Sequence, residues 1–372
     1  MGFALFFGAE LLLFAIFSLI KFDNKKQVNI CLGLMFFLMF IFSAMRGSGD
    51  GDYYNYLWFA KDIGTDSSKL FNFSYPVEFS FRLISYVINS LDISRQWVIA
   101  LMNLFSILPV FYVTAKKSKK PFLSAIIFMP LFLQFDMQTS RTATAIGLGL
   151  LSLNFMTEKR RILALVFLAL AVSFHRSALI LLPFLIYIEI DLSNISKTLL
   201  VLASFVVSIF SKLMFGILAK ILSLVGFGRM ATKIINYTFS GRFAYAMKIY
   251  DPRIILGLLL FVVSIMYFNK QTYKKHSMES AAIKAMCYGL CVMLIFRSST
   301  AIAFRFSSFF TIMQMFFIPM AIEKTKEYDP LATFMIVLSV VLFIIPYAIF
   351  IMVGSPAYDF FFTNLQAITS LR

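Results

Sequence analysis

Five short polar segments interrupt the long apolar stretches of this chain, and each carries side chains that could take part in a reaction. The first runs Arg46-Gly-Ser-Gly-Asp-Gly-Asp-Tyr-Tyr-Asn-Tyr. Its glycines allow sharp turns, and the carboxylates Asp50 and Asp52 could accept a proton from a hydroxyl group. Tyr53 and Tyr56 offer aromatic faces on which a sugar ring could stack. The segment predicts either a site for a hydroxyl-rich substrate or a flexible polar turn.

The second segment, residues 76–90, combines a predicted helix start with an arginine in the middle of an apolar run. Pro76 and Glu78 suit a first helical turn, and Arg82 follows one turn later. Residues 76–90 are too few for a comfortable bilayer crossing, and a crossing here would invert every later loop. We therefore expect a re-entrant or interfacial helix, which is tolerated in a membrane where it lines a cavity.

Two segments in the middle of the chain place basic side chains where apolar runs begin or break. Residues 138–145 place Arg141 among hydroxyl groups at a predicted helix start. Such a helix start could bind phosphate, and the alternative is a polar helix end with no ligand. Residues 162–190 are too long for one straight span, and each half is too short for its own. Two short helices meeting there would place His175 and Arg176 in a water-lined cavity, as broken helices do elsewhere. His175 could then move a proton or donate to an anion, and a plain polar turn is the alternative.

The last polar segment places two arginines near an apolar run towards the end of the chain. Arg297 is followed by Ser-Ser-Thr, and Arg305 lies about one turn inside the next predicted span. A charged arginine within lipid costs at least about 2.5–3.5 kcal/mol, so Arg305 needs a partner. The partner could be an anionic group of a substrate or a carboxylate such as Glu10.

The composition excludes a soluble protein. Of the 372 residues 60% are hydrophobic and only 14% are charged, and the mean hydropathy is +0.85. A soluble domain carries about 25% charged residues. We predict an all-α polytopic membrane protein that forms a single integral membrane domain over residues 1–372, with about twelve transmembrane helices of about 20 residues or somewhat fewer. The expected spans are roughly 3–20, 28–45, 94–115, 121–136, 139–156, 162–174, 177–190, 198–216, 254–269, 281–296, 302–322 and 331–352.

The lysines predict the orientation of these spans. With the spans counted as above, five lysine-rich clusters all fall on one side of the membrane, as cytoplasmic loops require. Both termini and the loops at about 46–93 and 215–253 then lie outside. The formal charge of +16 is therefore spread over short segments between spans, so we expect the lipid bilayer and not nucleic acid as a partner.

The arginines follow the opposite distribution. Eleven of them are expected on the outer side of the membrane, and only Arg160 and Arg161 on the cytoplasmic side. Topology needs only positive charge inside, whereas the planar arginine fork suits bidentate contact with phosphate. We interpret the outer arginines as an anion site, with contact to lipid headgroups as the alternative. The outer arginines are Arg46, Arg82, Arg95, Arg141, Arg176, Arg229, Arg242, Arg253, Arg297, Arg305 and Arg372.

We expect neither a metal nor an organic cofactor. The chain has two histidines, and its three cysteines lie inside apolar runs, so a site built from these zinc ligands is excluded. Asp50-Gly-Asp52 resembles the D-x-D that holds a metal beside a nucleotide in other enzymes, but nucleotide sugars are cytoplasmic and this loop is expected outside. The chain contains no P-loop or dinucleotide-binding motif.

Taken in order, these segments resemble the EpsG family of polysaccharide polymerases, which belongs with the Wzy-type O-antigen polymerases. The resemblance covers about residues 46–310 and rests on five features in sequence. These are Arg46 with its Gly-rich stretch and Asp52-Tyr53-x-x-Tyr56, Tyr75-Pro-Val-Glu, Ser140-Arg141-x-x-x-Ala145, Phe174-His175-x-Ser177-Ala-Leu-Ile-x-x-Pro183, and Arg305-Phe306. Two departures are that the family's usual His-Pro/Ser step reads His175-Arg176-Ser177 here and that Asp50-Gly51 precedes Asp52, which leaves open which of the two aspartates is the family's counterpart.

The resemblance implies a fold and an activity. It implies a GT-C-like, metal-independent glycosyltransferase with its active face on the periplasmic side of the bacterial inner membrane. Such an enzyme moves a growing glycan from its undecaprenyl diphosphate carrier onto the next carrier-linked repeat unit. Its partners would be these lipid-linked glycans and a chain-length regulator.

Within that frame we expect two groups of site residues. The expected catalytic residues are Asp52, His175, Arg176, Arg141 and Arg305. The expected substrate-binding residues are Arg46, Asp50, Tyr53, Tyr56, Glu78, Arg82, Arg229, Arg242 and Arg297. The alternative functions are a flippase or exporter of lipid-linked oligosaccharide, which needs access from both sides of the membrane, and an O-antigen ligase.

Overall fold

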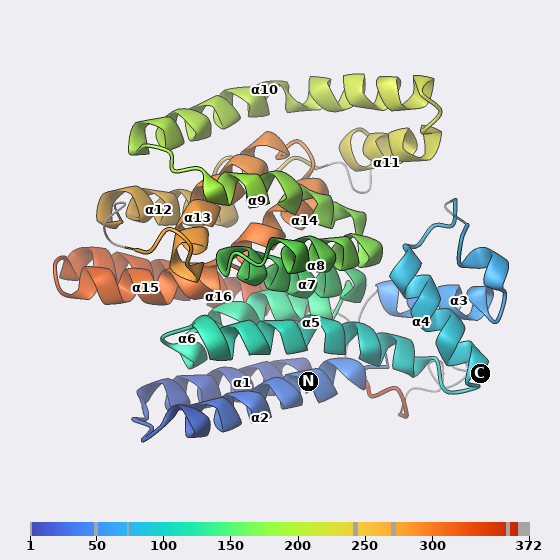
Figure 1. Ribbon diagram of the computed structural model, residues 1–372, viewed down its shortest axis with the longest axis horizontal. Helices are drawn as coiled ribbons and strands as arrows, with labels where there is room; N and C mark the ends of the chain where they lie inside the picture. The colour runs from blue at the N-terminus through green and yellow to red at the C-terminus, as the bar shows by residue number, and fades with distance from the viewer. Residues whose placement is uncertain are drawn as a thin grey trace. The chain divides into compact units, whose positions relative to one another are not determined.

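Helices account for nearly all of the secondary structure in the computed structural model (Figure 1), which describes residues 2–47, 51–72, 74–240, 245–268, 273–354 and 358–363. Within these ranges the one extended pairing is a bridge between Arg46 and Phe360. The chain divides into two compact units. Unit 1 comprises residues 1–182 and 344–372, and unit 2 comprises residues 183–343.

Unit 1 contains the first eight α-helices and three short helices of other types. Helix α7 packs against α5 and α8, α5 also packs against α2, and α1 packs against α6. The contact between α5 and α7 is close because Gly147 has no side chain: a Cβ there would lie 2.5 Å from the carbonyl oxygen of Ser106. The elements are α1 Gly2–Leu19, α2 Lys25–Ala44, α3 Gly51–Ile63, η1 Ser67–Lys69, α4 Phe79–Ser90, α5 Gln96–Lys117, α6 Pro121–Leu131, η2 Phe132–Asp136, α7 Ser140–Thr157, α8 Arg161–Phe174 and η3 Arg176–Ile180.

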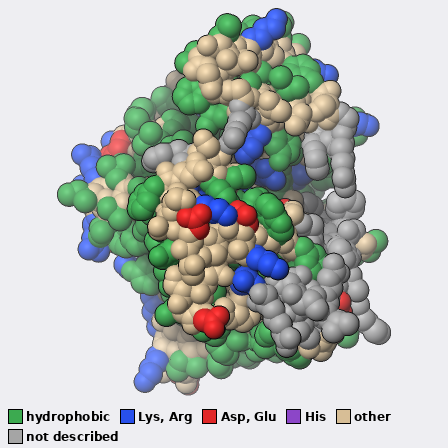
Figure 2. All heavy atoms as spheres, turned by 90° about the vertical axis from the view of Figure 1, so that its right-hand side faces the viewer, with side chains coloured by type: hydrophobic (Ala, Val, Ile, Leu, Met, Phe, Trp, Pro, Cys, Tyr) green, Lys and Arg blue, Asp and Glu red, His purple; other side chains and the backbone are tan. Residues whose placement is uncertain are grey.

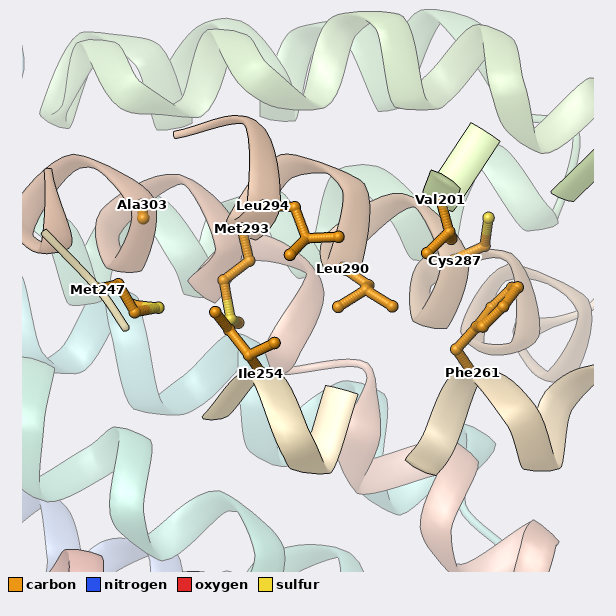
Figure 3. Packing of buried hydrophobic residues seen from close by; sticks show 9 residues of the cluster. All are labelled: Val201, Met247, Ile254, Phe261, Cys287, Leu290, Met293, Leu294 and Ala303. Carbon is orange, nitrogen blue, oxygen red and sulfur yellow. The ribbon is translucent and has the colours of Figure 1, made fainter. Parts of the chain in front are cut away.

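Unit 2 is built around α13, which packs against α10, α12, α14 and α15. Apolar side chains of α10, α12, α13 and α14 pack together in one cluster (Figure 3), with Leu290 and Met293 projecting from α13 and Ile254 and Phe261 from α12. Gly289 lets α14 approach α13, since a Cβ there would lie 2.7 Å from that of Phe310. The elements are α9 Leu181–Glu189, α10 Asn194–Leu224, α11 Gly228–Thr238, α12 Pro252–Tyr267, α13 Met278–Ile295, α14 Thr300–Thr311, α15 Gln314–Lys326 and α16 Pro330–Gly354, whose last turns belong to unit 1.

Local chemistry explains several helix starts. Asn24, Ser193 and Ser277 lie in extended backbone just before α2, α10 and α13, and each side chain accepts a backbone N–H from the first turn. Such caps satisfy amide groups that have no partner within the helix. The expected spans begin three or four residues later, at 28, 198 and 281, because the apolar runs define them, whereas the helices begin at these polar caps.

The membrane class is confirmed, but the number of spans is not. Four helices of the described chain, α2, α5, α10 and α13, are long and apolar enough to cross a bilayer. Five shorter apolar helices accompany them. The expected span 302–322 consists of two helices, α14 and α15, bent by 56° at residues 312–313; together they are long and apolar enough to form a fifth, broken span or a re-entrant loop. The expected count of twelve and the GT-C-like architecture remain predictions.

Candidate functional site

An ion pair between Glu78 and Arg141 lies at the centre of the candidate site in unit 1. Glu78 precedes the first turn of α4, and Arg141 is the second residue of α7. Arg141 Nη1 donates to Glu78 Oε2 at 2.5 Å, and only 19% and 13% of the two side chains are exposed. The guanidinium carbon lies 5.5 Å from the ring centre of Tyr56 and 5.9 Å from that of Phe81. Aromatic rings thus shield the pair from water and strengthen its attraction.

The helix break at residues 174–176 brings further positive charge to this pair. Helix α8 ends at Phe174, His175 is extended, and a 3₁₀ turn begins at Arg176. Burial of the Glu78 carboxyl group opposes its ionisation, but Arg141, His175 and Arg176 outweigh that effect, so the pKa of Glu78 lies below its ordinary value. Arg176 is exposed. Arg82 lies close enough to Arg176 for the two guanidinium groups to interact electrostatically. The Glu78 carboxylate therefore lies close to the guanidinium groups of Arg141, Arg176 and Arg82.

The orientation of His175 is held by a local turn. The N–H of Ser177 donates to His175 Nδ1 at 3.2 Å, and the Ser177 hydroxyl lies 2.6 Å from the same nitrogen. The sequence prediction of two short helices meeting at this point is confirmed. The break therefore presents one half-buried imidazole and one exposed guanidinium side by side.

Helix α3 contributes the third part of the site. Asp52 is half-buried in its first turn, and the Tyr56 hydroxyl lies 3.5 Å from Asp52 Oδ2. Tyr56 in turn forms one wall around Arg141. Tyr53 points inward, is fully buried and donates its hydroxyl to Gln96 Oε1 at 2.7 Å. In this arrangement the Asp52 carboxylate contacts Tyr56, whereas the Tyr53 ring supports the packing of α3 on α5.

Two arginines of unit 1 bind the protein itself. Arg46 is completely buried, and its Nη2 donates to Ser140 Oγ at 2.8 Å. Arg82 is buried as well, and its Nη1 donates to the carbonyl oxygens of Lys69 and Asn72 at 2.8 and 2.7 Å. Arg46 thus fixes the start of α7, and Arg82 fixes the loop before α4. Both arginines stabilise the backbone around the site.

The arginines predicted near the end of the chain belong to unit 2 and have separate surroundings. Arg297 Nε donates to Ser208 Oγ at 3.0 Å, and Arg305 Nη1 donates to the Tyr237 hydroxyl at 3.3 Å while its guanidinium carbon lies 5.4 Å from that ring centre. No carboxylate of the described residues lies within 4.0 Å of either arginine. Arg305 thus has a tyrosine partner here, and the expected alternative Glu10 lies in unit 1. Asp50, Arg242 and the side chain of Arg229 lie outside the described residues.

Gln96, which the sequence reasoning passed over, connects several of these parts. Its amide donates to the carbonyl oxygens of Ala44 and Arg46 at 2.6 and 2.9 Å and accepts the Tyr53 hydroxyl. The sequence feature that could have indicated its role is a polar residue at the start of the long apolar run that forms α5. A buried amide with all its groups paired holds α2, α3 and α5 in one arrangement.

The surface around α3 and α4 carries both signs of charge. Figure 2 shows basic and acidic side chains next to one another on the face that these helices form. In this part of the chain Lys69 and Asp62 form an ion pair at 3.2 Å. Within the described part of the chain, no three His, Cys, Asp or Glu side chains come together as metal ligands would. The guanidinium groups of Arg141 and Arg176 are donors of the kind that pair with carboxylate or phosphate oxygens.

The sequence model of the EpsG family matches residues 29–365. No curated protein matches the chain. No solved structure matches it either.

Proposed function

The chain belongs to the EpsG family, which is associated with polysaccharide polymerases, and we propose that it joins undecaprenyl-diphosphate-linked oligosaccharide repeat units into O-antigen or a related surface polysaccharide. The reaction would take place at the outer face of the bacterial inner membrane. The growing glycan would leave its carrier diphosphate and be transferred to a hydroxyl group of the next repeat unit.

The observation that supports this proposal is the cationic cluster around Glu78. The leaving group is a diphosphate whose negative charge grows in the transition state, and donors placed in advance stabilise such charge. Arg141 is oriented by Glu78, while Arg176 is exposed and free to meet a ligand. We assign the diphosphate to these two arginines. Glu78 would keep Arg141 in position until the anion arrives.

The attacking hydroxyl needs a base close to the same arginines. The Tyr56 hydroxyl lies 3.5 Å from Asp52 Oδ2, and the Tyr56 ring packs against the guanidinium group of Arg141. Tyr56 therefore contacts both the candidate base and the proposed diphosphate site. Either Asp52 or His175 could accept the proton. The donor sugar is already activated by its diphosphate, so the proposed reaction needs neither nucleotide nor metal ion.

Replacement of single arginines by lysine tests the assignment of the diphosphate. Lysine keeps the charge but loses the fork that contacts two phosphate oxygens. Arg141→Lys and Arg176→Lys should each slow polymerisation by roughly a hundred- to a thousandfold, equal to about 2.7–4 kcal/mol. Arg160→Lys is the matched control because Arg160 is exposed next to Phe155, at the far end of α7 and outside the site.

The readout is the length of surface glycan on gels, together with the amount of each variant in the membrane. Normal chain lengths in both site variants would show that these arginines do not bind diphosphate. A deletion strain separates the candidate functions: single repeats on lipid A indicate a polymerase, whereas complete loss of surface glycan indicates a flippase or a ligase. Arg305→Lys, tested in parallel, reports whether unit 2 contributes to the same reaction.

A further inference from the structure

The segment after the last helix returns to the end of α2. We call residues 358–363 the C-terminal strap. The N–H of Gly47 donates to the carbonyl oxygen of Asp359 at 2.7 Å, and the N–H of Phe361 donates to that of Met45 at 2.9 Å. Together these bonds form the antiparallel bridge between Arg46 and Phe360. The strap therefore fixes the backbone of the residue that carries the buried guanidinium group.

An aromatic contact anchors the start of the strap. The ring of Tyr358 stacks on that of Phe42 with centres 4.1 Å apart and planes 9° from parallel. Its hydroxyl donates to the carbonyl oxygen of Phe42 at 2.8 Å, and the residue is 9% exposed. A buried ring with a satisfied hydroxyl is a strong attachment for so short a segment.

Gly47 lies directly against the backbone of the strap. A Cβ at this position would lie 2.4 Å from Cα and 2.6 Å from N of Phe361. Both are backbone atoms, so no side-chain rotation could relieve the clash. An alanine would have to move the strap by about 1 Å to reach an ordinary contact distance of 3.4 Å.

Arg46 passes this constraint on to the candidate site. Its carbonyl oxygen accepts an N–H from Gln96 at 2.9 Å, and its guanidinium group holds the hydroxyl of Ser140. Ser140 opens α7 and directly precedes Arg141. The strap is thus hydrogen-bonded to both chain neighbours of Arg46, and the side chain of Arg46 is hydrogen-bonded to the chain neighbour of the residue that pairs with Glu78.

We propose that the C-terminal strap is a positioning element of the site: by pairing with Arg46 and Gly47 it fixes the start of α7, and with it the guanidinium group of Arg141. This proposal rests on the proposed function, because it assumes that Arg141 acts on the diphosphate. Gly47 and Tyr358 are then positioning residues that act through Arg46 and do not touch the substrate.

Docking of the strap can be measured without any activity. In a background without native cysteines, Met45→Cys and Phe361→Cys place two thiols on facing residues next to the bridge, at a separation that a short cross-linker with two thiol-reactive groups spans. The full-length parent should cross-link. Gly47→Ala and Tyr358→Ala should lose the cross-link, whereas Tyr358→Phe, which keeps the stacked ring, should retain it. Gly8→Ala is the matched control, because a Cβ there meets nothing within 4 Å.

Two functional readouts follow the same variants. Gly47→Ala and Tyr358→Ala should each lower the rate of polymerisation about ten- to a hundredfold, as a misplacement of about 1 Å does, at unchanged protein levels. The double variant should be no slower than the slower single one, since both changes act through the same strap. Inorganic diphosphate should raise the thermal unfolding temperature of the parent, Tyr358→Phe and Gly8→Ala more than that of the two strap variants.

The outcomes separate this proposal from the proposed function. The proposal is overturned if the parent does not cross-link, if Gly47→Ala and Tyr358→Ala bind diphosphate like the parent, or if their effects on rate multiply. A parent that binds diphosphate but does not polymerise would refute the proposed function, and the binding data would still decide the role of the strap.

Discussion

Glu78→Gln removes one negative charge from the site and leaves the shape of the side chain almost unchanged. In the wild-type protein the carboxylate is paired with Arg141 at 2.5 Å and also faces His175 and Arg176. The neutral amide would leave these groups without their shared counter-charge. We therefore expect the substitution to destabilise unit 1 while leaving its helices intact.

The geometry sets the size of the effect. Both side chains of the pair are less than one fifth exposed, so solvent screens the interaction only weakly. Removing one partner of such a pair costs about 3–5 kcal/mol. For a unit of this size, roughly 2–4 °C per kcal/mol gives a fall in unfolding temperature of about 6 °C or more. Asp62→Asn is the control, because its pair with Lys69 is about one third exposed and such pairs contribute only about 0–1 kcal/mol.

The pH dependence of the effect follows from the direction of the pKa shift. The pKa of Glu78 is lowered in the folded protein from an ordinary value of 4.5, so folding favours the ionised form. The resulting stabilisation is complete above that ordinary value and is lost as the pH falls through the lower folded pKa. The difference between wild type and Glu78→Gln should therefore stay constant from pH 8 to about pH 5 and shrink only in more acidic buffer.

Thermal unfolding in detergent micelles, followed by intrinsic fluorescence, measures the fall in unfolding temperature and its dependence on pH. Inorganic diphosphate should raise the unfolding temperature of Glu78→Gln more than that of the wild type, because the added anion replaces the missing carboxylate. Equal stability of the two proteins at neutral pH would refute the reasoning. A difference that grows as the pH falls from 7 to 5 would also contradict it.

Two further predictions concern topology and metal dependence. In whole cells a membrane-impermeant thiol reagent should label a cysteine placed at Asp66 or Lys233 and spare one at Lys117 or Lys274; the reverse pattern would overturn the proposed orientation. Polymerisation of carrier-linked repeats by purified protein should persist in excess chelator, since the proposed diphosphate donors are guanidinium groups. Complete loss of activity that Mg²⁺ restores would instead support a metal site at the Asp-Gly-Asp sequence.

The sequence by itself determined the features that depend on neighbouring residues. Long apolar runs with few charges specify membrane helices, because an unpaired backbone or a free charge is costly in lipid. The break at His175 is visible because a polar step interrupts an apolar stretch that is too long for one span. The helix α4 is expected from Pro76 and Glu78 as residues of its first turn, and the structure begins it just after them, at Phe79. Composition and residue order suffice for these predictions.

Only the tertiary structure decided which of the charged side chains meet. Glu78 and Arg141 are 63 residues apart, and Tyr358 reaches Phe42 across 316 residues. Arginines that look alike in the sequence differ in role: Arg46 is buried and binds a serine, whereas Arg176 is exposed. Residue type sets what a side chain can bind, but its partner depends on the direction in which packing aims it, and that direction comes from contacts between helices far apart in the chain.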